Sequence, residues 1–198
     1  MVSADGTPEV FKIRAPDQGS ARALEVRLVP VGDYGRLPVR RLEPLSTELA
    51  SHGRRLGLFD EAEPLALDFT DESASASTAG GVPRSSGITV RRNGLRSAWS
   101  TLPPGTLLVE DDVVGRLEDL MTALLALDLP VPDRVAPVVA VEPLDLVRGG
   151  GQDPAADAEH VRVPAAQEFA VDRLRDNVHD VAEDLASRLV AAVRREVR

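Results

Sequence analysis

The amino-acid sequence predicts an α+β fold: a mostly antiparallel sheet, one central helix and a long C-terminal helix packed on one face of the sheet. Leu24, Val26 and Leu28 alternate with charged residues, which is the pattern of a half-buried strand. The dipeptide Asn93-Gly94 separates two runs of β-prone residues and predicts a hairpin turn. The C-terminal segment carries apolar residues at the spacing of one helix face: Val178, Val181, Ala182, Leu185, Leu189, Val193 and Val197.

The first third of the chain predicts two paired strands, a helix and a further strand. Residues 1–8 are polar, and we expect them to be flexible. Residues 10–14 alternate as a strand does, and we expect them to pair in antiparallel fashion with residues 24–28. Leucines at helical spacing predict a helix over residues 44–56, and the alternation in residues 65–69 predicts another strand.

The middle of the chain combines a long segment without periodicity and the predicted hairpin. Residues 71–86 are small and polar, so we expect a flexible loop there. The hairpin joins residues 88–92 to residues 95–100 through a type I′ turn, which requires positive φ at both central residues. This turn would place Ile88 opposite Trp99, so that the indole covers Ile88 across the two strands.

The last third predicts two helices and short strands. The acidic triplet at residues 110–112 predicts a helix start with an Asp N-cap, because carboxylates stabilise the positive end of the helix dipole. Residues 138–141 predict a buried strand, and the glycine-rich residues 148–160 predict a flexible loop. We therefore expect an α+β core domain over residues 9–147. A C-terminal strand and helix, residues 161–198, are expected to pack on this core.

Composition and charge exclude several classes of site. The chain has 198 residues, 43 % of them apolar, and no cysteine, which excludes disulfides, thiol nucleophiles and cysteine-bound zinc. The net charge of −9 opposes direct nucleic-acid binding, which needs a basic surface. The polar N-terminus lacks the apolar core of a signal peptide, and no apolar run approaches the roughly 18 residues of a membrane span. We expect a cytoplasmic protein without membrane contact or cofactor.

Few residues suggest catalytic chemistry. The triplet at residues 110–112 follows a short apolar run, and acids at the end of a strand can hold Mg²⁺. However, helix capping accounts for the triplet, no phosphate-binding loop accompanies it, and Lys12 is the only lysine. His52, His160 and His179 lack the spacing of metal ligands, so the sequence predicts no metal site.

The predicted hairpin carries the candidate binding residues. Arg91, Arg92 and Arg96 cluster at the turn, and Trp99 is their aromatic neighbour. Guanidinium groups beside an indole are suited to phosphate or to an acidic partner. The alternative is a solvated strand edge, because charged residues on edge strands are common in ordinary sheets. We predict Arg91, Arg92, Arg96 and Trp99 as binding residues and keep this alternative open.

Three stretches carry a resemblance to a known family: GDYGRLPVRRLEPLSTELASHGRRLGLFDEAE (32–63), SGITVRRNGLRSAWSTLPPG (86–105) and LALDLPVPDRVAPVVAVEP (125–143). They resemble the region that follows the DNA-binding domain in actinobacterial proteins of the Schlafen AlbA_2 type. The resemblance implies that nucleic-acid binding belongs to an upstream AlbA-like domain, so it assigns DNA binding to no residue of this chain. It implies an accessory module, and the arginine- and alanine-rich composition is typical of a high-GC bacterium.

Two functional hypotheses follow. The first is a non-catalytic interaction or accessory module of a bacterial cytoplasmic protein, with a protein partner and an association with a nucleic-acid-binding system. The second is a small hydrolase or transferase whose active site assembles from dispersed residues, with residues 110–112 and His160 as the first candidates. The lack of a catalytic motif favours the first hypothesis.

Overall fold

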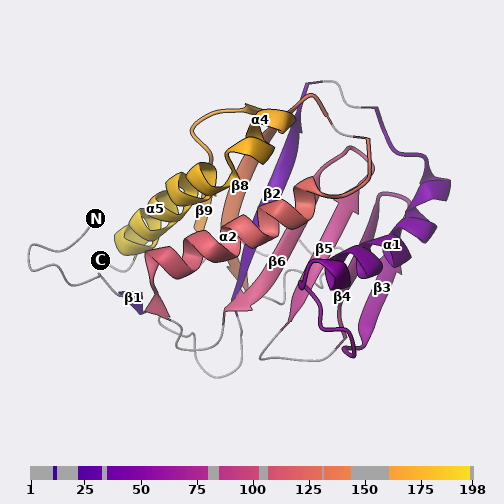
Figure 1. The fold of residues 1–198 in the computed structure, drawn as a ribbon, viewed down its shortest axis with the longest axis horizontal. Helices are drawn as coiled ribbons and strands as arrows, with labels where there is room; N and C mark the ends of the chain where they lie inside the picture. The colour runs from indigo at the N-terminus through magenta and orange to yellow at the C-terminus, as the bar shows by residue number, and fades with distance from the viewer. Residues whose placement is uncertain are drawn as a thin grey trace, which may run out of the picture.

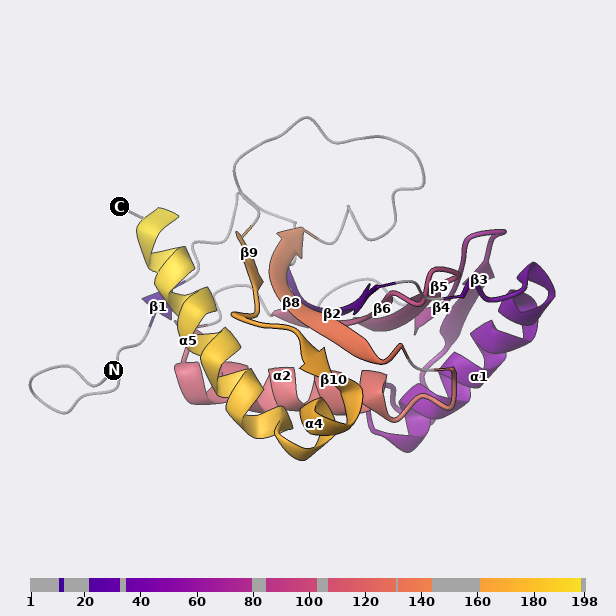
Figure 2. The same ribbon diagram turned by 90° about the horizontal axis from the view of Figure 1, so that it is seen from above.

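The fold is a twisted antiparallel sheet with helices packed against one face (Figure 1, Figure 2). This arrangement confirms the predicted α+β class. The computed structural model describes residues 11–12, 22–32, 35–79, 85–102, 107–130, 132–143 and 161–196.

The main sheet has eight strands in the order β10-β8-β2-β6-β5-β4-β3, with β9 also paired to β8. Neighbouring strands are antiparallel in every pairing. The bounds are β2 Arg22–Val31, β3 Leu65–Phe69, β4 Ser73–Thr78, β5 Ser86–Arg91, β6 Arg96–Leu102, β8 Arg134–Pro143, β9 Val161–Pro164 and β10 Phe169–Ala170.

A separate two-stranded ribbon joins β1 (Phe11–Lys12) to β7 (Leu107–Leu108). The predicted pairing of residues 10–14 with residues 24–28 is therefore wrong. The reason is that β2 has β6 on one edge and β8 on the other, which leaves no edge for a third strand. Residues 13–21 lie outside the described part of the chain.

The predicted helices are confirmed, and a short helix precedes the last one. The bounds are η1 Val39–Arg41, α1 Leu42–Arg55, α2 Glu110–Leu125, α4 Val171–Asp176 and α5 Val178–Glu196. α1 packs across β3 and β4, α2 packs across β6 and β2, and α5 packs on α2 and β9 (Figure 2). The three acids of residues 110–112 lie in the first turn of α2 as predicted, although the N-cap is Val109 and not an Asp.

The core lies between the helices and the helix-facing side of the sheet. Leu24, Val26 and Leu28 of β2 are all at most 2 % exposed, as predicted, but Glu25 on the other face is also buried at 7 %, so this part of β2 is not the half-buried strand that the alternation predicts. α2 and α5 close this core with aliphatic side chains at helical spacing. These buried side chains include Val113, Leu117, Leu120, Met121, Leu124, Val181, Ala182, Leu185 and Leu189.

Strand β4 corrects the expected loop over residues 71–86 in part, since residues 80–84 of that loop lie outside the described residues. Ala74 and Ala76 are fully buried on the side that faces α1, and Ser73, Ser75 and Ser77 lie on the other side. The segment alternates serine with alanine, but its residues are small and alanine is depleted in strands, so the strand signal is weak. Hydrogen bonding to β3 on one edge and to β5 on the other holds the segment extended.

The β5–β6 hairpin is confirmed, but its turn differs from the predicted type. The N–H of Arg91 donates to the carbonyl of Leu95 (2.8 Å), which leaves a three-residue loop. Gly94 has φ +83°, whereas no described residue other than glycine has positive φ. Asn93 therefore does not form the left-handed pair of a type I′ turn, and the loop is the three-residue kind with glycine in the left-handed region.

This turn shifts the strand register by one residue, and such a shift moves every β6 side chain to the opposite face. Trp99 pairs with Gly87 instead of Ile88, and Arg96 pairs with Val90 on the helix-facing side. A Cβ added to Gly87 would lie 2.5 Å from the indole of Trp99. Glycine is therefore required where the indole crosses β5.

No helix in the described ranges is both long and apolar enough to cross a bilayer. The predicted flexible segments, residues 1–8 and 148–160, lie outside the described residues. Residues 161–196 extend the same structure, because β9 pairs with β8 and α5 packs on α2.

Candidate interaction site

β3 is the last strand of the sheet, and one of its edges has no neighbouring strand in the part of the chain that the structure describes (Figure 1). We call this feature, formed by Leu65–Phe69, the β3 edge. The side chains of Leu67 and Phe69 are 46 % and 49 % exposed. Exposed edge strands usually carry charged side chains, above all lysine, or proline or a bulge that hinders pairing with another chain, and this strand has a single charge, Asp68, and neither lysine nor proline. The β3 edge is therefore open to strand addition.

The turn between β3 and β4 is held in a fixed shape by its own hydroxyl group. Thr70 Oγ1 accepts hydrogen bonds from the backbone N–H groups of Glu72 and Ser73, both at 3.1 Å. The N–H of Thr70 also donates to the carbonyl of Ser73 (2.8 Å). Threonine is suited to this position because its hydroxyl can replace a backbone acceptor in a tight turn.

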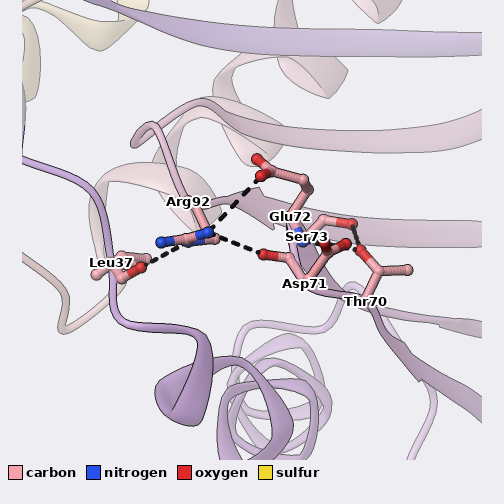
Figure 3. Close-up of polar contacts among 6 residues, drawn as sticks. All are labelled: Leu37, Thr70, Asp71, Glu72, Ser73 and Arg92. Atoms are coloured by element: carbon pink, nitrogen blue, oxygen red, sulfur yellow. Dashed lines mark hydrogen bonds and ion pairs between the residues drawn. The ribbon is translucent and has the colours of Figure 1, made fainter.

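Arg92 connects this turn to the segment that precedes α1 (Figure 3). Its Nε donates to the carbonyl of Leu37 (2.9 Å), and its Nη1 lies 3.4 Å from the carbonyl of Asp71. The same Nη1 lies 3.7 Å from the carboxylate of Glu72. The backbone N–H of Arg92 donates to the carbonyl of Glu72, and the carbonyl of Arg92 accepts from the N–H of Leu37, both at 2.9 Å. Arg92 thus positions the end of β3.

The structure separates the four residues predicted as a binding site. Arg91 is exposed at the end of β5, and Arg92 is half-buried in the contacts described above. Arg96 and Trp99 are 4 % and 6 % exposed, so the expected exposure of the arginine cluster is wrong for Arg96. The register shift places Arg96 on the helix-facing side of the sheet and so accounts for its burial. A binding role for Arg91 stays a prediction.

Arg96 completes the C-terminal end of α2. Its Nη1 donates to the carbonyl of Leu124 (3.0 Å), and its Nη2 donates to the carbonyl of Pro130 (3.0 Å) and lies 3.4 Å from that of Leu129. The last carbonyls of a helix have no partner within the helix and carry the negative end of its dipole. A buried guanidinium supplies both hydrogen bonds and charge at this position.

His52 and Arg175 also donate hydrogen bonds to carbonyls at the C-terminal end of α2. The Nε2 of His52 donates to the carbonyl of Ala123 (2.8 Å), and its Nδ1 accepts from the guanidinium of Arg55 (2.9 Å). Arg175 donates to the carbonyl of Leu125 (3.1 Å). Burial lowers the pKa of His52, and the nearby cations lower it further, although the hydrogen bond to Ala123 acts in the opposite direction. The ring is therefore neutral near pH 7.

A hollow of about 290 Å³ lies beside this region and is lined by His52, Arg55 and leucines of α1. Both ring nitrogens of His52 already have partners, so the imidazole is committed to structure. A second hollow of about 270 Å³ lies between Gly57, Ser86 and Arg116. The hydroxyl of Ser86 donates to the carbonyl of Leu58 (2.6 Å) and is likewise engaged.

The residues of the catalytic hypothesis show no convergence in the described ranges. Asp111 and Asp112 are exposed in the first turn of α2, and Glu110 accepts a hydrogen bond from the hydroxyl of Ser187 on α5. His160 lies outside the described residues, so the pairing of His160 with these acids is untested. Within the described ranges, no three histidine or acidic side chains gather as metal ligands.

Comparison with known proteins gives no relative from which to transfer a function. No protein-family model, no curated protein and no solved structure matches this chain. The resemblance to the Schlafen AlbA_2 region stays a prediction, and the functional argument rests on the geometry of the β3 edge.

Proposed function

We propose that this chain is a non-catalytic protein-interaction module, an accessory unit of a bacterial cytoplasmic protein, that binds a partner by strand addition at the β3 edge. The observation that carries the proposal is a strand that pairs with β4 on one edge, has no strand neighbour on its other edge among the described residues, and bears two half-exposed large apolar side chains, Leu67 and Phe69. In strand addition, backbone hydrogen bonds provide affinity and alternate side chains provide specificity. The β3 edge offers both kinds of contact.

Rigidity of the β3–β4 turn favours this use. A strand that is already ordered loses less conformational entropy on binding than a flexible segment does. Thr70 holds the turn at the end of β3, and Arg92 contacts the carbonyls of Glu72 and Asp71 in that turn, so Arg92 acts in the proposal as a positioning residue. The net charge of −9 favours a protein partner over direct contact with nucleic acid. An association with a nucleic-acid-binding system follows from the family resemblance alone.

A photo-crosslinking amino acid placed at residue 67 tests the proposed function. The full chain is added to an extract of its source organism and irradiated, and covalent adducts are identified by mass spectrometry. We expect adducts to a polypeptide at residue 67, because strand addition brings a partner backbone within about 5 Å of β3. The matched control carries the same group at Glu183, an exposed residue of α5, and α5 lies on the opposite side of the molecule from β3 (Figure 1).

Equal adduct yields at residues 67 and 183, or no adduct at either residue, would contradict the proposal. A second variant, Arg92→Met, examines the positioning role. We expect it to lower the adduct yield at residue 67 while the yield of the residue 183 control stays unchanged. Arg91→Glu, on the neighbouring exposed position, tests the predicted contribution of Arg91 in the same assay.

A further inference from the structure

The backbone of β3 presents a defined set of hydrogen-bonding groups to solvent. Two hydrogen bonds fix the phase of the β3–β4 ladder: Thr70 N–H to the carbonyl of Ser73, and Ala79 N–H to the carbonyl of Pro64, both at 2.8 Å. In an antiparallel ladder such pairs recur at every second residue. Ala66 and Asp68 therefore bond to β4. The N–H and C=O groups of the other three residues, Leu65, Leu67 and Phe69, point to the open edge.

This set is symmetric about Leu67, so it is complementary to itself. If two β3 edges meet in antiparallel fashion with Leu67 opposite Leu67, then Leu65 lies opposite Phe69 and Ala66 lies opposite Asp68. Each outward-facing residue then meets another outward-facing residue, which gives three pairs that exchange both backbone hydrogen bonds. A shift of the register by one residue would set outward groups against inward groups and lose these bonds.

The side chains favour the same register. Leu65, Leu67 and Phe69 share the helix-facing side, so the pairing joins them into one apolar seam, and Asp68 meets Ala66 rather than another acid. Centring the pair on Asp68 would oppose two carboxylates directly, which is destabilising. Centring it on Ala66 would leave Phe69 without an outward-facing partner.

Exposed charges of opposite sign lie near the two ends of α1. Arg54 donates to the carbonyl of Glu63 (3.0 Å), so the C-terminal end of α1 lies beside the start of β3. Glu43 and Arg54 are both exposed and are eleven residues apart, which is about three helical turns, so they share one side of the helix. Antiparallel pairing reverses the second helix and brings Glu43 of each copy towards the end that carries Arg54 of the other.

We infer that the partner at the β3 edge is a second copy of this chain, bound by antiparallel pairing of the two β3 strands with Leu67 on the twofold axis. The inference rests on the proposed function, because both use the β3 edge. In this dimer the two eight-stranded sheets form one continuous sheet, and the two β3 strands pair in a single register.

Single cysteine variants test the register, since the natural chain has no cysteine. In the inferred dimer, the two copies of residue 67 have Cα atoms about 5.5 Å apart, which is within the range of a disulfide. We expect Leu67→Cys to form a covalent dimer under mild oxidation. Phe69→Cys is the matched control, because Phe69 shares the face and the exposure of Leu67. Its two copies would lie about 14 Å apart, four residues along the strand, and cannot join.

Sedimentation of the unmodified chain provides the second measurement. We expect a species of twice the 21.2 kDa chain mass that increases with concentration. Leu67→Lys places two ammonium groups opposite each other and should weaken association by about tenfold or more. Hydrogen exchange should slow with concentration at the amides of Leu65, Leu67 and Phe69, whereas Ala66 and Asp68 should not change, because β4 already holds them.

The outcomes separate this inference from the proposed function. A monomer at all concentrations, or equal cross-linking of Leu67→Cys and Phe69→Cys, overturns the self-pairing. If residue 67 still photo-crosslinks to a different polypeptide, the β3 edge remains an interaction site and only the identity of the partner changes. If neither experiment gives an adduct at residue 67, both proposals fail.

Discussion

The C-terminal end of α2 and the β3 edge pose the same physical problem, and this fold treats them in opposite ways. Each is the end of a regular hydrogen-bonding pattern, so each leaves backbone groups without partners in their own element. At α2, the carbonyls of residues 123–125 accept hydrogen bonds from His52, Arg96 and Arg175, which come from three different elements. At the β3 edge, the outward backbone groups have no strand partner among the described residues. The contrast distinguishes a completed structural junction from a surface available to a partner.

The largest effect should follow from Arg96→Met, which removes the buried donor at α2. Methionine keeps much of the side-chain volume but leaves the buried carbonyl of Leu124 without this donor, whereas Pro130 is exposed and its carbonyl can turn to water. An unsatisfied buried group costs about 1–3 kcal/mol, so we expect the free energy of unfolding to fall by about 2 kcal/mol. Urea denaturation followed by the fluorescence of Trp99, the only tryptophan, measures this change.

Arg91→Met is the matched control, because Arg91 is exposed and lies just across the same hairpin. It should change the free energy of unfolding by no more than about 0.5 kcal/mol. If the two variants are equally stable, the hydrogen bonds of Arg96 do not stabilise the end of α2.

The sequence predicts the scaffold of this molecule well because its elements have strong local periodicity. The alternation in β2 and the helical stripes of α2 and α5 are properties of neighbouring residues, and they identify each element without tertiary information. β4 carries only a weak signal, since the alternation in SASAST is between small residues and alanine is depleted in strands. Only its position between β3 and β5 makes it a strand.

The candidate site could be predicted only in part. The role of Arg96 depends on the hairpin register. That register depends on whether Asn93 and Gly94 both adopt positive φ, as in a type I′ turn, or Gly94 alone does, as observed. A single turn residue thus decides whether Arg96 faces solvent or α2. The β3 edge carried a usable signal, namely the apolar alternation of residues 65–69 without a lysine or proline, but its place at the end of the sheet is a tertiary property.

A smaller effect should appear in the pH dependence of stability. Burial lowers the pKa of His52 below its ordinary value of about 6.5, so folding opposes protonation of this ring. The stabilisation is fully present above about pH 6.5 and is lost as the pH falls towards the depressed folded-state pKa. We expect the urea midpoint to decrease from pH 7.5 to pH 5.5, and His52→Gln, which can still donate to Ala123, should flatten this decrease.

His179 provides a control of opposite sign. A hydrogen bond and an ion pair with Glu118 (3.2 Å) raise the pKa of His179, so its contribution is present at low pH and is lost as the pH rises through the raised pKa. His179→Gln should therefore make the decrease at low pH slightly steeper. Parallel pH profiles for the unmodified chain and His52→Gln would show that His52 does not couple protonation to folding.

The smallest change in stability should come from the β3 edge itself. Leu67 is 46 % exposed, and the alkyl stem of a lysine can cover the same surface while its ammonium group stays in water. We expect Leu67→Lys to change the free energy of unfolding of the monomer by no more than about 0.5 kcal/mol. Calorimetry at concentrations where the unmodified chain is monomeric measures this change. A loss of several kcal/mol would mean that Leu67 belongs to the core, and the β3 edge would then be part of the scaffold rather than a surface for binding.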